Sequence, residues 1–243
     1  LAHGAQCTIV DKLYYDGSLE RVAYDRIGKA LEKARNLRQY FGHESVPEVG
    51  LYYSARSRDW WGRSDAPRYM RSFWGAHLAM MHGHVPMGVI VDENMSQQEE
   101  LQRYPVVLLA GTTILSDAEV RAFEAYVRGG GKLLVTGLTG VCDWFGNVQS
   151  HSSIEGLIGA RLVGCELQHP DNYLRLPEIG EDSDPLGAIL HASIEEPFDL
   201  LVYGPAAAYE PLTATAYGQL LVAYRSENNQ WVNHMSSGKV IGP

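Results

Sequence analysis

The turn "VTGLTGVCDWFG" at 135–146 comes closest to presenting a nucleophile. A reactive thiol at a strand-to-helix corner is typically held in a Gly-x-Cys-x-Gly turn. Here the five residues Thr136 to Gly140 put Leu138 at the nucleophile position, and an alkyl chain cannot attack. Cys142 follows four residues later, and no His-x-Glu pair lies downstream to activate it. We expect Cys142 to act as a small buried apolar residue.

The candidates for a metal site and for a phosphate-binding loop are weaker. His77 and His82 are five residues apart, which puts them on different faces of a helix, and His84 follows Gly83 in a turn. The "GGGK" at 129–132 ends a helix, whereas a phosphate loop must follow a strand and open a helix. The acidic segment 177–185 lacks the spacing of a calcium loop. We therefore expect no metal and no cofactor.

The segment "SRDWWGR" at 57–63 resembles a binding site more than any other part of the chain. Flat indoles flanked by charged groups suit the faces and hydroxyls of sugars. Contact with a neighbouring domain or subunit is an equal alternative for these side chains. The candidate residues for sugar binding or an interface are Trp60, Trp61, Arg63 and Asp59. No pair of carboxylates suited to glycoside hydrolysis stands out, so we predict no catalytic residue in this chain.

Four apolar runs separated by helical patterns must position these residues. The strands are predicted at 49–53, 88–91, 106–110 and 133–136. Their alternation with helices predicts right-handed crossovers and a doubly wound parallel sheet of the flavodoxin-like α/β class. Ligands of such sheets bind at the carboxyl ends of the strands, which is where Trp60 and Cys142 fall.

Helical spacing predicts which side chains these helices bury. Ser116 and Glu119 form an S-x-x-E capping box that opens one helix, and Gly129 to Gly131 end it. Pro67 lies in the first turn of another helix. The predicted buried positions of the two helices are Tyr69, Met70, Phe73, Trp74, Leu78, Met81, Val120, Phe123, Tyr126 and Val127.

The two ends of the chain differ from this pattern. Residues 1–15 predict a short strand around Ile9 and Val10, and residues 20–41 an amphipathic helix. Beyond about residue 150 the chain breaks into short runs at 161–167, 200–203 and 219–224, which predicts a strand-rich extension. The start at Leu1 and the stop at "GKVIGP" suggest part of a longer polypeptide.

Charge and composition exclude some classes of function. A net charge of −9 and dispersed basic residues argue against nucleic-acid binding. The apolar runs are too short to span a membrane. Three widely spaced cysteines predict reduced thiols and a cytoplasmic location.

The stretches "VGLYYSARSRDWWG" and "YPVVLLAGTTILSDAEVRAFEAYVRGGGKLLVTGLTG" resemble the β-galactosidase trimerisation domain, which follows the catalytic barrel in family-42-type and related hypothetical glycoside hydrolases. Tyr53-Ser54, Leu115-Ser116 with Glu119, and Tyr126-Val127 with Gly129 to Leu133 carry the likeness. The resemblance covers about residues 46–150, and relatives of the glutamine amidotransferases share much of it.

The resemblance implies a glutamine-amidotransferase-like domain that has lost its nucleophile and associates subunits, with a homotrimer and carbohydrate as partners. Residues 1–43 resemble the last strand and helix of a barrel, which would place His3, Gln6 and Asp11 at its active-site end. We therefore expect a barrel remnant at 1–45, a trimerisation-type domain at 46–160 and a strand-rich extension at 161–243. The alternative is a glutamine-amidotransferase-like hydrolase that uses Cys142.

Overall fold

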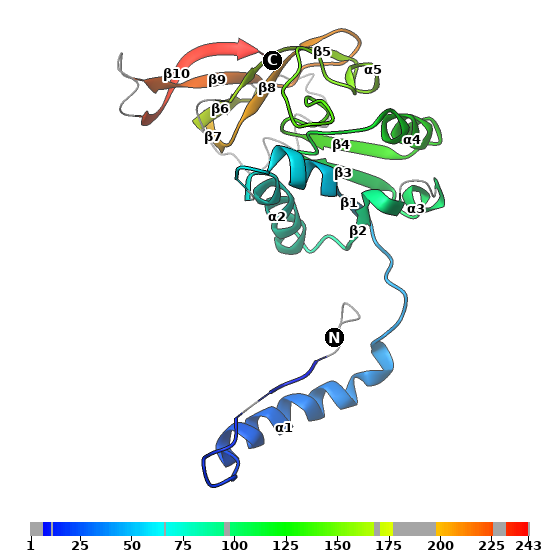
Figure 1. The fold of residues 1–243 in the computed structure, drawn as a ribbon, viewed down its shortest axis with the longest axis vertical. Coiled ribbons are helices and arrows are strands. Elements are labelled where there is room, and N and C mark those ends of the chain that lie inside the picture. The colour runs from blue at the N-terminus through cyan, green and yellow to red at the C-terminus, as the bar shows by residue number, and fades with distance from the viewer. Residues whose placement is uncertain are drawn as a thin grey trace, which may run out of the picture. The chain divides into compact units, whose positions relative to one another are not determined.

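Short apolar runs form the two central strands of a parallel sheet in the computed structural model (Figure 1). The structure describes residues 7–10, 12–65, 67–94, 98–167, 171–176, 198–225 and 232–242. The strand order is β2-β1-β3-β4, and every neighbouring pair is parallel. The strands are β1 Val49–Tyr53, β2 Met87–Val91, β3 Val106–Ala110 and β4 Lys132–Thr136.

Helices cover both faces of this sheet, α2 on one side and α3 and α4 on the other (Figure 1). Successive strand residues point to opposite faces. Leu51 of β1 therefore packs with Tyr69 and Phe73 of α2, while its neighbour Tyr52 packs with Phe123 of α4. These elements are η2 Ser57–Trp61, α2 Pro67–His82, η3 Asp92–Asn94, α3 Gln98–Gln102 and α4 Asp117–Arg128.

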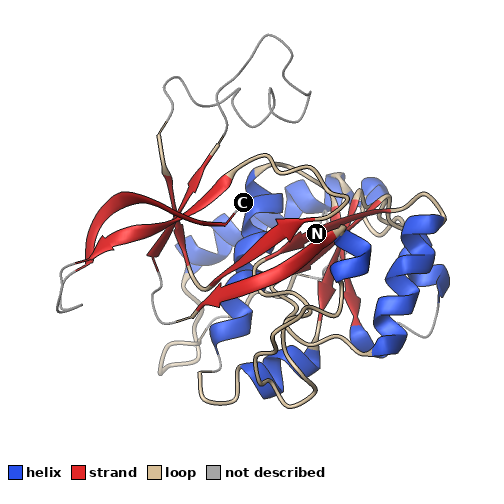
Figure 2. Ribbon diagram, turned by 90° about the horizontal axis from the view of Figure 1, so that it is seen from above, coloured by secondary structure: helices blue, strands red, loops and turns tan. Residues whose placement is uncertain are grey.

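Antiparallel strands make up the rest of the second half, as the sequence predicts. β5 pairs with β8, and a four-stranded sheet has the order β10-β9-β6-β7. Figure 2 shows the strands of this second sheet grouped together at one side of the parallel sheet. The elements are α5 Glu155–Ile158, β5 Ala160–Glu166, β6 Asp171–Arg175, β7 Leu200–Tyr203, β8 Ala206–Pro211, β9 Gln219–Arg225 and β10 Val232–Gly242.

The chain divides into two compact units, Leu1–Val46 and Pro47–Pro243. The first unit contains α1, Arg21–Asn36, and a short 3-10 turn, Arg38–Tyr40. The helix therefore ends five residues before the predicted limit at residue 41. The predicted strand at Ile9 and Val10 is wrong, because both residues are exposed and have no strand partner in the described part of the chain.

The burial prediction for α2 is wrong in one respect. Tyr69 and Phe73 are buried, but Trp74, Leu78 and Met81 are exposed. Helical periodicity identifies apolar positions, and it cannot tell whether a neighbouring element is present to cover them. In α4, Phe123 and Tyr126 are buried as predicted and Val120 is partly buried, but Val127 is 36% exposed, so the prediction is wrong for Val127.

Candidate functional site

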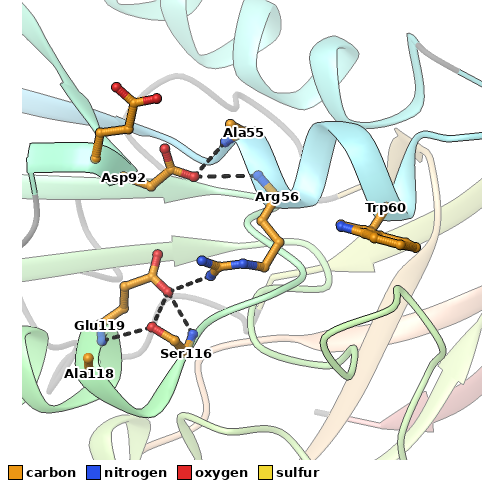
Figure 3. A pocket seen from close by; sticks show the side chains of 8 residues that line it. Ala55, Arg56, Trp60, Asp92, Ser116, Ala118 and Glu119 are labelled. Atoms are coloured by element: carbon orange, nitrogen blue, oxygen red, sulfur yellow. Dashed lines mark hydrogen bonds and ion pairs between the residues drawn. The ribbon is translucent and has the colours of Figure 1, made fainter.

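A hollow of about 480 Å³ opens where the parallel strands end, at the point where β1 lies between β2 and β3. The crossover after β1 runs to β2 on one side and the crossover after β3 runs to β4 on the other, which leaves a crevice where open α/β sheets bind ligands. Figure 3 shows Arg56 between two carboxylates, with Trp60 at one side. The lining residues are Ala55, Arg56, Trp60, Asp92, Glu93, Ser116, Ala118 and Glu119.

Glu119 forms the floor of this hollow from the first turn of α4. Its carboxylate closes the predicted capping box by accepting from the Ser116 N–H and hydroxyl. It also accepts from Arg56 Nη1 at 2.9 Å and from the Tyr52 hydroxyl. Burial, together with the Glu119 charge, raises the pKa of Tyr52 and keeps this donor protonated. With four donors on its oxygens, Glu119 holds the floor together and has little capacity for proton transfer.

Asp92 fixes the opposite wall, because it lies just after β2 and turns toward the segment that follows β1. Its Oδ2 accepts from the backbone N–H of Ala55 at 2.8 Å and of Arg56 at 3.4 Å. These amides open the helical segment that continues into Ser57–Trp61, so the carboxylate acts as an N-terminal cap supplied by another strand. This contact holds Arg56 and Trp60 beside the hollow (Figure 3).

Aromatic side chains from two segments form what we call the rim: Trp60 lines the hollow, and Trp144 and Phe145 contact the lining residues Arg56 and Trp60. Trp60 meets Phe145 edge to face, with ring centroids 5.4 Å apart, and the Arg56 guanidinium lies 3.8 Å from the centroid of Trp144. Gly146 allows this approach: it has φ 81°, and a Cβ there would lie 2.8 Å from the Trp60 carbonyl oxygen. Trp60, Trp144 and Phe145 are all exposed. The rim therefore offers flat apolar faces next to charged groups.

Sequence reasoning named Trp60 and missed Arg56, Glu119, Trp144 and Phe145 as members of one site. A signal was present, because Asp143-Trp144-Phe145-Gly146 repeats the Asp-aromatic-aromatic-Gly order of residues 59–62. Arg56 and Glu119 are 63 residues apart, and only the strand order brings them together.

The other predicted residues lie in different surroundings. Trp61 is buried in the α2 core with the Arg68 guanidinium 3.8 Å from its ring centroid. Asp59 pairs with exposed Arg58, which lowers the pKa of the carboxyl, and Arg63 is exposed. Contact of these side chains with carbohydrate or a subunit stays a prediction. His3, Gln6 and Asp11 lie outside the described residues, as do His169 and the whole acidic segment 177–185.

The corner after β4 has no nucleophile in place. Gly137 has φ 61°, and the next side chain, Leu138, is 2% exposed within the α2 core. Cys142 packs into the same core, and burial raises the pKa of its thiol to about 12. Such a thiol is protonated at neutral pH and is a poor nucleophile. Among the residues that the structure describes, no group of three His, Cys, Asp or Glu side chains could hold a metal ion.

No described helix is long and apolar enough to cross a bilayer.

A family model for the β-galactosidase trimerisation domain matches residues 48–180. No curated protein sequence matches this chain.

Among solved structures, α-L-fucosidase isoenzyme 2 from Paenibacillus thiaminolyticus has a TM-score of 0.72 at 21% identity, covering 100% of this chain and 34% of the fucosidase. The β-galactosidase from Bacillus circulans sp. alkalophilus has a TM-score of 0.68 at 13% identity, covering 87% and 30%. The β-galactosidase from Rahnella sp. R3 has a TM-score of 0.66 at 13% identity, covering 86% of this chain and 30% of the β-galactosidase. These likenesses show a shared fold, and the chain spans about a third of each structure's length.

Proposed function

This chain belongs to the β-galactosidase trimerisation domain family, and on that premise we propose that it is the non-catalytic, subunit-associating part of a carbohydrate-active enzyme. The family match over more than half of the chain carries the proposal. The core position of Leu138 and the protonated state of Cys142 agree with it, since neither can supply a nucleophile.

The strand order supports the finer assignment to the flavodoxin-like class. An order of 2-1-3-4 is that of the first four strands in flavodoxin-like sheets. The glutamine-amidotransferase-like relationship, the barrel origin of residues 1–45 and the cytoplasmic location belong to the same proposal. Free thiols at Cys7, Cys142 and Cys165 suit a reducing compartment.

The predicted partner of this domain is a second and third copy of the same chain. Sedimentation equilibrium of the 243-residue chain should return three times the monomer mass of 26.9 kDa. A chain that stays monomeric at micromolar concentration would contradict the associating role.

We also propose that the hollow beside Trp60 contributes to a carbohydrate site. Its exposed indole offers a platform for a sugar face, and Asp92, Glu93 and Arg56 can bond hydroxyls. The structurally similar proteins named above are an α-L-fucosidase and β-galactosidases, so galactose, lactose and fucose are the first ligands to test.

The test is titration calorimetry of the wild-type chain and a Trp60→Ala variant with each sugar. We expect Trp60→Ala to weaken binding about tenfold, because a stacked aromatic ring contributes about 1 kcal/mol or more. Phe198→Ala is the matched control, since Phe198 is exposed but does not line the hollow. Absence of heat with the wild-type chain, or equal affinity in Trp60→Ala, would remove the sugar role and leave the associating role intact.

A further inference from the structure

Helix α2 has an apolar surface beyond the face that it buries. Trp74, Leu78 and Met81 are 58%, 53% and 52% exposed. Their spacing of four and three residues puts them on one side of the helix. Tyr69 and Phe73 already anchor α2 to the sheet, so the exposed stripe is not needed to hold the helix in place.

The edge strand β2 carries one more exposed apolar residue on the face of the sheet that α2 covers. Val89 pairs in register with Leu51, so both side chains lie on the face that α2 covers. Leu51 is buried, whereas Val89, on the edge strand, is exposed. We call Trp74, Leu78, Met81 and Val89 the β2-edge surface.

An apolar groove lies at the opposite edge of the same sheet. It has a volume of about 480 Å³ and runs between α4, β4 and α5. Lys132 is the one charged residue in its lining. We call it the β4-edge groove, and its lining is Val127, Gly131, Lys132, Leu133, Val135, Leu157 and Ile158.

We propose that the β2-edge surface of one copy docks into the β4-edge groove of the next copy, and that three such contacts close a ring. The inference rests on the proposed associating role. A three-fold ring requires head-to-tail contacts, so each copy must carry two different and complementary surfaces. This unit carries an apolar stripe on helix α2, together with exposed Val89 on the edge strand β2, and a separate apolar groove at the β4 edge.

The shapes and the residue composition of the two surfaces suit this docking. A helix that lays large apolar side chains into a groove is a recurrent recognition mode. Tryptophan is among the residues that contribute most to binding at the centre of a protein interface, and Trp74 is the largest side chain of the stripe. The stripe carries no charge and the groove a single one, so docking would desolvate little charge.

The test uses one charged substitution on each surface, measured by sedimentation equilibrium. Leu78→Arg on the stripe and Val127→Arg at the rim of the groove change exposed side chains, and circular dichroism checks that each variant folds. We expect each to weaken self-association at least about thirtyfold, as expected for an anchor residue worth about 2 kcal/mol. Val202→Arg, an exposed apolar site on β7, is the matched control and should keep the wild-type mass.

Mixing the two variants shows whether neighbouring copies associate head to tail or through a two-fold contact. A mixture of Leu78→Arg and Val127→Arg retains one intact pair of surfaces, so we expect dimers that do not grow into trimers. If the stripe instead paired with itself, Val127→Arg alone would keep the wild-type mass, which would overturn the inference. Leu157→Ser is a second groove variant in case Val127→Arg does not fold.

The outcomes also separate this inference from the proposed function. A monomeric wild-type chain would contradict the associating role itself. If the wild-type chain is trimeric and both Leu78→Arg and Val127→Arg keep the trimer mass, only the choice of surfaces is contradicted.

Discussion

At the scale of single residues, the identity of a side chain and its burial answer different questions. Leu138 stands where a nucleophile would have to be, and the sequence alone rules it out as one. Cys142 needed the structure, because a thiol four residues from the corner could still have pointed outward. It lies 7% exposed, beside Cys165 and Tyr209 in the α2 core.

The burial of Cys142 predicts how it reacts. The thiolate form of cysteine attacks iodoacetamide and displaces iodide, and a raised pKa of about 12 leaves the Cys142 thiol neutral at pH 7.5. Burial also raises the pKa of Cys165. We expect the folded chain to label fast at exposed Cys7 only, and the Cys142 rate to rise with pH through the alkaline range as thiolate forms.

Mass spectrometry of peptides from the labelled chain locates the modification. A Cys7→Ser variant should remain almost unlabelled at pH 7.5 until guanidinium unfolds it, after which Cys142 and Cys165 should both react. Rapid alkylation of Cys142 in the folded protein would revive the hydrolase alternative.

At the scale of elements, Glu119 links two segments that are more than 60 residues apart in the sequence, the start of α4 and the region of β1. It caps α4 through Ser116, pairs with Arg56 after β1 and accepts from Tyr52 within β1. The capping box could be predicted from the sequence because it spans four residues, but the tertiary partners of Glu119 could not. The same limit applies to Trp60 and Trp61, since adjacent indoles give no sequence signal for which one faces the core.

Removing the Glu119 charge should therefore destabilise the fold. In Glu119→Gln the side chain keeps its size, but Arg56 loses its anionic partner in a largely buried setting. We expect a loss of about 2 kcal/mol in the free energy of unfolding, since breaking a buried pair leaves an uncompensated charge and Arg56 retains some solvent access. Urea denaturation followed by circular dichroism measures it.

The matched control lies on the same helix. Glu124 pairs with Arg128 one turn away at 3.0 Å, and both side chains are exposed. Glu124→Gln should cost about 0.5 kcal/mol or less, as surface pairs do. Equal losses in the two variants would mean that the Glu119 network contributes no more than a surface ion pair.

At the scale of the whole molecule, the strands of the parallel sheet are easier to predict from the sequence than the elements that pack on the sheet and its helices. Apolar runs and helical periods indicated all four parallel strands to within a residue, because each signal is local. The exposure of Trp74, Leu78 and Met81 was not predictable, since it depends on which elements are absent beside α2. The strands β6 and β8 were missed, because short alternating runs resemble loops.

The first unit has no core of its own among its described residues. Helix α1 buries no residue, and Tyr24, Leu31 and Leu37 are exposed. The core clusters of the described chain draw all their members from residue 49 onward. A lone 16-residue helix is only marginally stable in water, even with Glu20 accepting from the Val22 N–H at its start.

A chain that begins at Pro47 should consequently keep its stability. We expect its thermal midpoint to lie within about 2 °C of the full chain, because the described core clusters contain no residue before 49, and a peptide of residues 1–46 to show little helix by circular dichroism. A chain that begins at Ser54 provides the contrast: it lacks β1, the strand between β2 and β3, and should not fold. If the chain from Pro47 lost cooperative unfolding, residues 1–46 would have to supply part of its core, and the division into two units would fail as a description of stability.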